Sequence, residues 1–269
     1  MSFQPIVPIG GLSGWNFLNS TLATQKQAFD SGPRITRDTE YFEQKISQIA
    51  SAEDLVADRR LLRVALGAFG LQEDLDNRFL IRKILEGGTE NPDALANKLS
   101  DSRYKDLAQA FGFADQAKPN TQTPGFGVQI TANYKTRAFE VAVGDQDQSL
   151  RLAMNAEREL AKIAMESNSD SEDTLWLRIM GNPPLRKVLE TTLGLPKTFA
   201  QLDIDKQVEI FQDKAASQLK ISSLTDLRDA DLRESLIERF LLRDQLSATS
   251  SLSSNSIALT LLQSSPPRF

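Results

Sequence analysis

The sequence predicts an all-α, multi-helical protein made of two similar halves packed together. Three observations support this prediction: apolar residues recur at helical spacing, capping signals separate the helical segments, and a stretch of the first half matches one of the second. The chain has 269 residues, of which 40% are hydrophobic and 25% charged, as in ordinary globular proteins. It is long enough to bury a sizeable core.

The first 33 residues are expected to form an N-terminal arm that is extended or partly helical. They are rich in Gly, Ser, Asn and Pro, and their apolar anchors are Trp15, Phe17 and Leu18. A first helical domain is predicted for residues 34–113.

Several helices are expected in this first domain. Ser51-Ala-Glu-Asp54 resembles a capping box, and Gly70 stands where a helix C-cap glycine is expected. The run between them carries one apolar stripe, made of Leu55, Leu62, Leu66 and Phe69. Asn91-Pro92 is predicted to be an N-cap and a first-turn proline, and Asp101 to cap a further short helix.

A linker is predicted at residues 114–125, because this stretch is polar and broken by Pro and Gly. The segment after it is ambiguous. Phe126, Val128 and Ile130 alternate as in a strand, whereas Ile130, Tyr134, Ala138 and Val141 fall at helical spacing. The longer period favours a helix over residues 126–143.

The second helical domain is predicted to span residues 126–246. Asp145-Gln-Asp-Gln148 is expected to cap a long helix that runs to about Glu166, and Ser171 to start the next. Asn182-Pro183-Pro184 is expected to begin another that ends at Gly194. A Ser-rich C-terminal tail follows at residues 247–269.

The two halves match when the chain is shifted by 124 positions, which aligns residues 55–71 with residues 179–195. A capped helix ending in Gly-Leu is a common pattern, so chance competes with duplication. We favour duplication, because each copy lies between comparable helices. The identical pairs are Leu61/Leu185, Val64/Val188, Gly70/Gly194 and Leu71/Leu195.

The chain contains neither histidine nor cysteine. This excludes disulfides, thiolate nucleophiles, imidazole bases and zinc sites of the Cys/His type. Two Ser-x-x-Lys patterns, at Ser102 and Ser217, lack the companion motifs of penicillin-recognising enzymes. Two Asp-x-Asp pairs, at Asp145 and Asp203, are explained by helix capping. The sequence therefore predicts no catalytic, cofactor-binding or metal-ligating residues, and no cofactor.

The charge pattern argues against nucleic acid as a partner. The formal net charge is −5, and the basic residues are interleaved with acidic ones, so no basic stripe is formed. No apolar run approaches the roughly 18 residues that a membrane helix needs, so membrane insertion is not expected. The N-terminus does not resemble a secretory signal. We therefore expect a cytoplasmic protein, or one exported without a cleaved signal.

Both termini carry apolar residues outside the clearly periodic helices. One interpretation is that these segments bind a partner protein, and the other is that they pack back onto the bundle. The candidate partner-binding residues are Trp15, Phe17, Ile257, Leu259 and Leu262.

Three groups of residues resemble a known family. The first is the run Tyr134-Lys-Thr-Arg-Ala-Phe-Glu-Val-Ala-Val-Gly144, which continues into Gln146-Asp147 and Leu150-Arg151-Leu152-Ala153. The second is Ala57-Asp-Arg-Arg-Leu-Leu62 with Ala68-Phe-Gly-Leu71, and the third is Pro183-Pro-Leu-Arg186 with Gly194-Leu-Pro196. Together they resemble an uncharacterised bacterial domain-of-unknown-function family whose genes often lie among flagellar genes in alphaproteobacteria. The resemblance covers roughly Phe3 to Leu242 and implies an all-helical fold. It implies no catalytic residues.

The leading hypothesis is a non-enzymatic protein that binds other proteins, flagellar components among them, and assists flagellar assembly or function. The alternatives are an uncharacterised enzyme and a regulatory module that binds a small ligand, each using a cleft between the two halves.

Overall fold

The computed structural model describes residues 3–166 and 171–263, with side chains described as far as Ala248, and these ranges contain helices and no strand. The all-α fold class is therefore confirmed. The α-helices are α1 Gly11–Asp30, α2 Pro33–Lys45, α3 Ala52–Ala57, α4 Arg59–Phe69, α5 Arg78–Gly87, α6 Leu95–Lys98, α7 Arg103–Phe111, α8 Phe126–Gly144, α9 Gln148–Glu166, α10 Glu172–Met180, α11 Pro183–Leu193, α12 Ile204–Leu219 and α13 Ala230–Gln263. Short 3-10 turns connect several of them: η1 Ile46–Gln48, η2 Gln72–Asp76, η3 Asn120–Gln122, η4 Lys197–Gln201 and η5 Leu224–Arg228.

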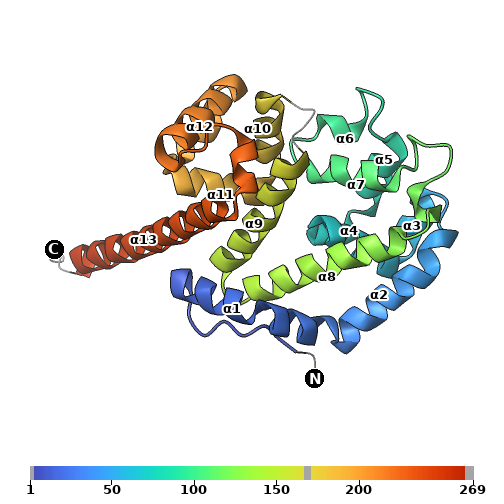
Figure 1. Cartoon of the computed structure of the whole chain (residues 1–269), viewed down its shortest axis with the longest axis horizontal. Coiled ribbons are helices and arrows are strands. Elements are labelled where there is room, and N and C mark those ends of the chain that lie inside the picture. Colours follow the sequence, from blue (N-terminus) through green and yellow to red (C-terminus); the bar gives the residue numbers. More distant parts are fainter. Residues whose placement is uncertain (1–2, 167–170, 264–269) are drawn as a thin grey trace, which may run out of the picture.

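The helices enclose two large hydrophobic clusters (Figure 1). One is built mainly from α2 to α7, and the other mainly from α9 to α13. Helix α8 contributes to both: Phe126, Ile130 and Tyr134 belong to the first cluster, whereas Phe139 and Val143 belong to the second. The boundary between the clusters thus lies within α8, and it does not coincide with the predicted linker at 114–125.

The long helix predicted over residues 126–143 is confirmed as α8. The capping residues predicted at the starts of α9, α10 and α11 are also confirmed. Asp147 Oδ1 accepts hydrogen bonds from the N–H groups of Ser149 and Leu150, at 2.8 and 3.2 Å. Ser171 and Asn182 cap α10 and α11.

The single apolar stripe predicted after Ser51 is wrong, because the chain leaves the helical conformation at Asp58. That residue has φ −92° and ψ 101°, and its carboxylate accepts hydrogen bonds from the N–H groups of Arg60 and Leu61. The Tyr41 hydroxyl donates to the same carboxylate at 2.6 Å. Asp58 therefore ends α3 and starts α4, so the apolar residues are divided between two short helices.

The helix predicted to begin at Asn91-Pro92 is also wrong. Asn91 Oδ1 accepts from the N–H of Asp93 at 2.9 Å, which closes a local turn. Helix α6 begins only at Leu95. Asn stabilises turns and helix starts through the same side-chain hydrogen bond, so the sequence pattern does not distinguish the two.

Helices α4 and α11 are built alike, as the internal match predicts. Each has 11 residues, and each is followed by a glycine in the left-handed region, Gly70 at φ 74° and Gly194 at φ 65°. Only glycine adopts this conformation without strain, so both helices stop at the same place. The order α3, α4, η2, α5 parallels α10, α11, η4, α12. Duplication itself stays a prediction.

The two predicted terminal segments are both largely helical. The N-terminal arm contains α1, and the C-terminal tail continues α13 as far as Gln263. Helix α13 packs through Leu236, Ile237 and Phe240, and its C-terminal end projects from the body in Figure 1.

Candidate functional site

The predicted partner-binding residues occupy different environments. Trp15 is 2% exposed, and its indole N–H donates to Glu234 on α13 at 2.8 Å. Phe17 lies on the outer surface of α1 and is 36% exposed. Ile257, Leu259 and Leu262 fall in the last part of α13, and their side chains lie outside the described residues. The structure therefore does not bring these five candidates together.

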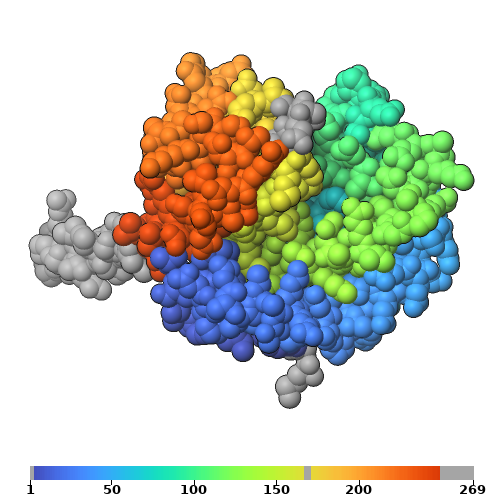
Figure 2. Space-filling model, in the orientation of Figure 1, coloured from blue at the N-terminus to red at the C-terminus, as the bar shows by residue number. Residues whose placement is uncertain are grey.

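A pocket of about 250 Å³ lies where five parts of the chain meet. Side chains come from the N-terminal segment, the junction of α1 and α2, helix α4, the turn η2 and the stretch formed by helix α8 and the residue after it. The space-filling view shows how the N-terminal segments cover the edge of α8 (Figure 2). The pocket thus depends on contacts between segments that are far apart in the sequence.

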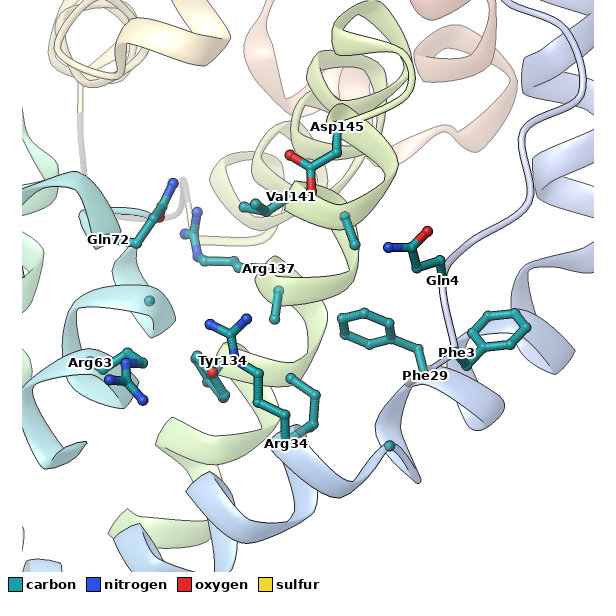
Figure 3. A pocket seen from close by; sticks show the side chains of 15 residues that line it. Phe3, Gln4, Phe29, Arg34, Arg63, Gln72, Tyr134, Arg137, Val141 and Asp145 are labelled. Carbon is teal, nitrogen blue, oxygen red and sulfur yellow. The ribbon is translucent and has the colours of Figure 1, made fainter. Parts of the chain in front are cut away.

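One side of the pocket is apolar (Figure 3). Phe3 and Phe29 lie together there in the close-up view, with the Gln4 amide beside them. Val141 and Ile35, which is 7% exposed, add further apolar side chains to the pocket lining. Phe29 is held in place by an edge-to-face contact with Phe139, with ring centroids 5.5 Å apart. This side could hold an aliphatic or aromatic group.

The other side carries Arg34, Arg63 and Arg137, from α2, α4 and α8 respectively. Each guanidinium has five N–H donors. Among the described residues, Arg34 and Arg63 donate no hydrogen bond, and Arg137 donates one, to Glu159 at 2.7 Å. The nearest carboxylate to Arg63 is Asp38, at 3.6 Å. Most of the donors at this side are therefore without a protein acceptor.

Tyr134 lies between these arginines, and its position depends on a glycine. A Cβ atom at Gly67 of α4 would lie 2.7 Å from Cδ2 of the Tyr134 ring, so only glycine lets α4 and α8 approach this closely. Burial, with a smaller contribution from Asp38, raises the pKa of Tyr134. The phenol is therefore protonated at neutral pH and can donate a hydrogen bond.

Helix α2 begins at the pocket. Its N-cap is Gly32, its first residue is Pro33, and no side chain caps its first turn. The first-turn N–H groups carry the partial positive charge of the helix dipole, which adds to the positive charge of the arginines.

The N-terminal wall of the pocket is held by two side-chain amides. Gln25 accepts from the N–H of Ile6 at 2.6 Å and donates to the carbonyl of the same residue at 3.2 Å. Gln146 accepts from the N–H of Val7 at 3.3 Å and donates to the carbonyl of Pro5. The backbone of the segment is thus fixed from both sides, and Phe3 and Gln4 are placed at the pocket.

Behind the pocket, Arg137 also belongs to a charge network between α8 and α9. Arg158 donates to both carboxylate oxygens of Glu140, at 2.7 and 3.0 Å, and also to Glu159. Burial opposes the charge of Glu159, but Arg158 and Arg137 outweigh it and lower its pKa. The network holds two cations and two anions, so its charges are balanced.

The pocket holds few ionisable side chains. Its ionisable side chains are the three arginines, Tyr134 and Asp145. Throughout the described residues, no group of three or more acidic side chains could hold a metal ion. None of the described helices combines the length and the apolar character needed to cross a membrane.

The pocket arginines were not among the candidates that the sequence suggested. They lie in three different helices and become neighbours only through packing. One signal was present, because the distinctive run from Tyr134 to Gly144 contains five pocket residues: Tyr134, Arg137, Ala138, Val141 and Ala142.

Comparisons with known proteins agree with the fold. A solved X-ray structure of a protein from Agrobacterium tumefaciens matches with a TM-score of 0.72 and 26% sequence identity, over 91% of this chain and 99% of the other. The comparison with curated proteins gives no match. A family model described as "Protein of unknown function (DUF1217)" matches residues 68–231, which is more than half of the chain. The chain therefore belongs to the DUF1217 family.

Proposed function

We propose that the protein is a non-enzymatic accessory protein that binds other proteins and assists flagellar assembly or function. The observation behind this proposal is the apolar surface of α13 where the helix leaves the body. Leu241 is buried, whereas Leu242 is 48% exposed and Leu246 is 66% exposed. Exposed leucines one helical turn apart are typical of a helix that docks into a partner's groove.

The chemistry of the chain supports a binding role. Without histidine and cysteine, the common general base and thiol nucleophile are missing. The charged residues between α8 and α9 are matched in pairs, which suits a structural role. The flagellar setting comes from the resemblance to a family whose genes often lie among flagellar genes, which is an associational argument.

The test is a crosslinking pull-down from motile cells. The bait is the full-length protein, compared with a variant that carries Leu242→Ser and Leu246→Ser. The matched control carries Leu177→Ser and Leu202→Ser, because these leucines, in α10 and directly after η4, are 44% and 45% exposed. We expect flagellar rod, hook or export components with the full-length protein and the control, but not with the α13 variant. Recovery of the same partners with all three baits, or of no flagellar component, would contradict the proposal.

A second candidate function is a module that binds a small ligand. It is favoured by one observation, the pocket in which Arg34 and Arg63 donate no hydrogen bond to any described residue. Pockets with an apolar surface and a few convergent polar groups are the usual form of ligand sites.

A further inference from the structure

We propose that the pocket between α2, α4 and α8 binds a carboxylate group carried on a compact apolar or aromatic body. This inference rests on the ligand-binding candidate function and does not depend on the docking surface of α13.

The charge of the pocket indicates an anion. Three arginines and one carboxylate, Asp145, line it, in a chain whose net charge is −5. Asp145 is exposed, and Figure 3 shows it apart from Arg34 and Arg63. Neighbouring cations repel one another unless an anion compensates them. Glu159 accepts from Arg137, and Asp38 lies 3.6 Å from Arg63, but no described carboxylate pairs with Arg34. A bound anion would supply the missing acceptor.

The shape of the pocket indicates a carboxylate. Guanidinium groups bind carboxylates and phosphates through paired N–H donors, and the Tyr134 phenol adds a single donor. The opposite side is formed by the rings of Phe3 and Phe29, and the Gln4 amide beside them is one polar group for the outer oxygens of a phosphate. A planar carboxylate leaves its apolar body free to contact that side.

The volume limits the size of the ligand. At about 250 Å³, the pocket lies below the range of roughly 300–1,000 Å³ that holds drug-sized molecules. A single ring or a short branched chain with its carboxylate is therefore expected. Two sources have this chemistry: a small free acid, and the C-terminal residue of a peptide with an apolar side chain.

The experiment is isothermal titration calorimetry on the full chain with four probes. Phenylacetate represents the free acid, and N-acetyl-phenylalanine represents a chain end. N-acetyl-phenylalaninamide keeps the ring without the carboxylate, and inorganic phosphate is an anion without an apolar body. We expect both carboxylates to bind at least tenfold more tightly than the amide and phosphate. Tighter binding of phenylacetate would identify a free acid as the source, and tighter binding of N-acetyl-phenylalanine a chain end.

Variants locate the binding in the pocket. Arg34→Gln and Arg63→Gln should each weaken binding of the carboxylates about tenfold or more, since a hydrogen bond to a charged group contributes about 1.5–3 kcal/mol. Tyr134→Phe, which keeps the ring against Gly67, should weaken it severalfold. The control is Arg37→Gln on the same helix, whose Nε donates to the Pro33 carbonyl outside the pocket.

Three results would overturn the inference: no binding of either carboxylate at millimolar concentration, equal binding of the amide or phosphate, or equal effects of Arg34→Gln and Arg37→Gln. None of these results would alter the pull-down through α13, so the two proposals fail separately.

Discussion

Helix α8 takes part in two clusters of charge that differ in one respect. In the network with α9, Arg137 and Arg158 face Glu140 and Glu159, so each cation has an anion beside it. In the pocket, Arg137 joins Arg34 and Arg63, and the cations outnumber the anions. The same arginine thus contributes to a balanced cluster on one side and an unbalanced one on the other.

The difference separates two uses of a charged side chain. Buried charges that are paired within the protein fix how two helices pack, and removing one partner leaves the other without compensation. Donors left without acceptors at a surface pocket contribute little to packing and are available to a ligand. The balanced network should therefore matter for stability, and the arginine pocket for binding.

The largest effect is expected at the network. Glu159→Gln removes the carboxylate shared by Arg137 and Arg158, and should lower the free energy of unfolding by about 3–5 kcal/mol. Denaturant unfolding followed by circular dichroism measures this change. The control is Glu209→Gln, which breaks an exposed pair with Lys206 and should cost less than about 1 kcal/mol. Equal losses in the two variants would contradict the distinction.

Acid should weaken the same network. The pKa of Glu159 in the folded protein lies below its ordinary value of 4.5, so the network stabilises the fold fully above that pH. The stabilisation should be lost as the pH falls from 4.5 through the folded pKa. The gap in unfolding free energy between wild type and Glu159→Gln should therefore narrow below pH 4.5. A gap that stays constant from pH 7 to pH 3 would show that Glu159 stabilises by other means.

A smaller effect is expected at the glycine that places Tyr134. Gly67→Ala puts a Cβ 2.7 Å from the tyrosine ring, and the overpacking should cost about 1–3 kcal/mol. Alanine's better helix propensity offsets about 1 kcal/mol of this, so a net loss of about 1–2 kcal/mol is expected in thermal or denaturant unfolding. In the control, Gly87→Ala, the new Cβ would meet nothing closer than 3.7 Å. This variant should not be destabilised.

The smallest effect on stability is expected at Arg34. Arg34→Gln removes an exposed cation that donates no hydrogen bond to the described residues, so the free energy of unfolding should change by less than about 0.5 kcal/mol. The same variant should strongly weaken carboxylate binding. A loss of several kcal/mol would mean that Arg34 stabilises the fold as Arg158 does, and the contrast between the two clusters would fail.

Much of the fold could be predicted from local signals. Capping at Ser171 and Asn182, and the glycines after α4 and α11, act over a few residues, so the sequence around them is sufficient. The end of α3 and the start of α4 at Asp58 could not be predicted, because the apolar residues on both sides of Asp58 keep helical spacing in the sequence. Two short helices therefore give the same apolar periodicity as one long helix.

The pocket could not be predicted in the same way. Its three arginines, Arg34, Arg63 and Arg137, are far apart in the sequence and lie in three different helices. Within its own helix, each resembles an ordinary surface cation. What makes them a site is the close approach of α4 and α8 at Gly67, a tertiary contact. A glycine among the apolar residues of a helix is a weak signal of such an approach.

The place of α8 has a consequence for how the protein unfolds. Its first half completes one hydrophobic cluster, and its second half completes the other, along one continuous helix. If one cluster unfolded alone, half of α8 would lose its apolar contacts while the other half remained packed in the second cluster. We therefore expect both clusters to lose their structure in a single cooperative transition, with α8 as the element that couples them.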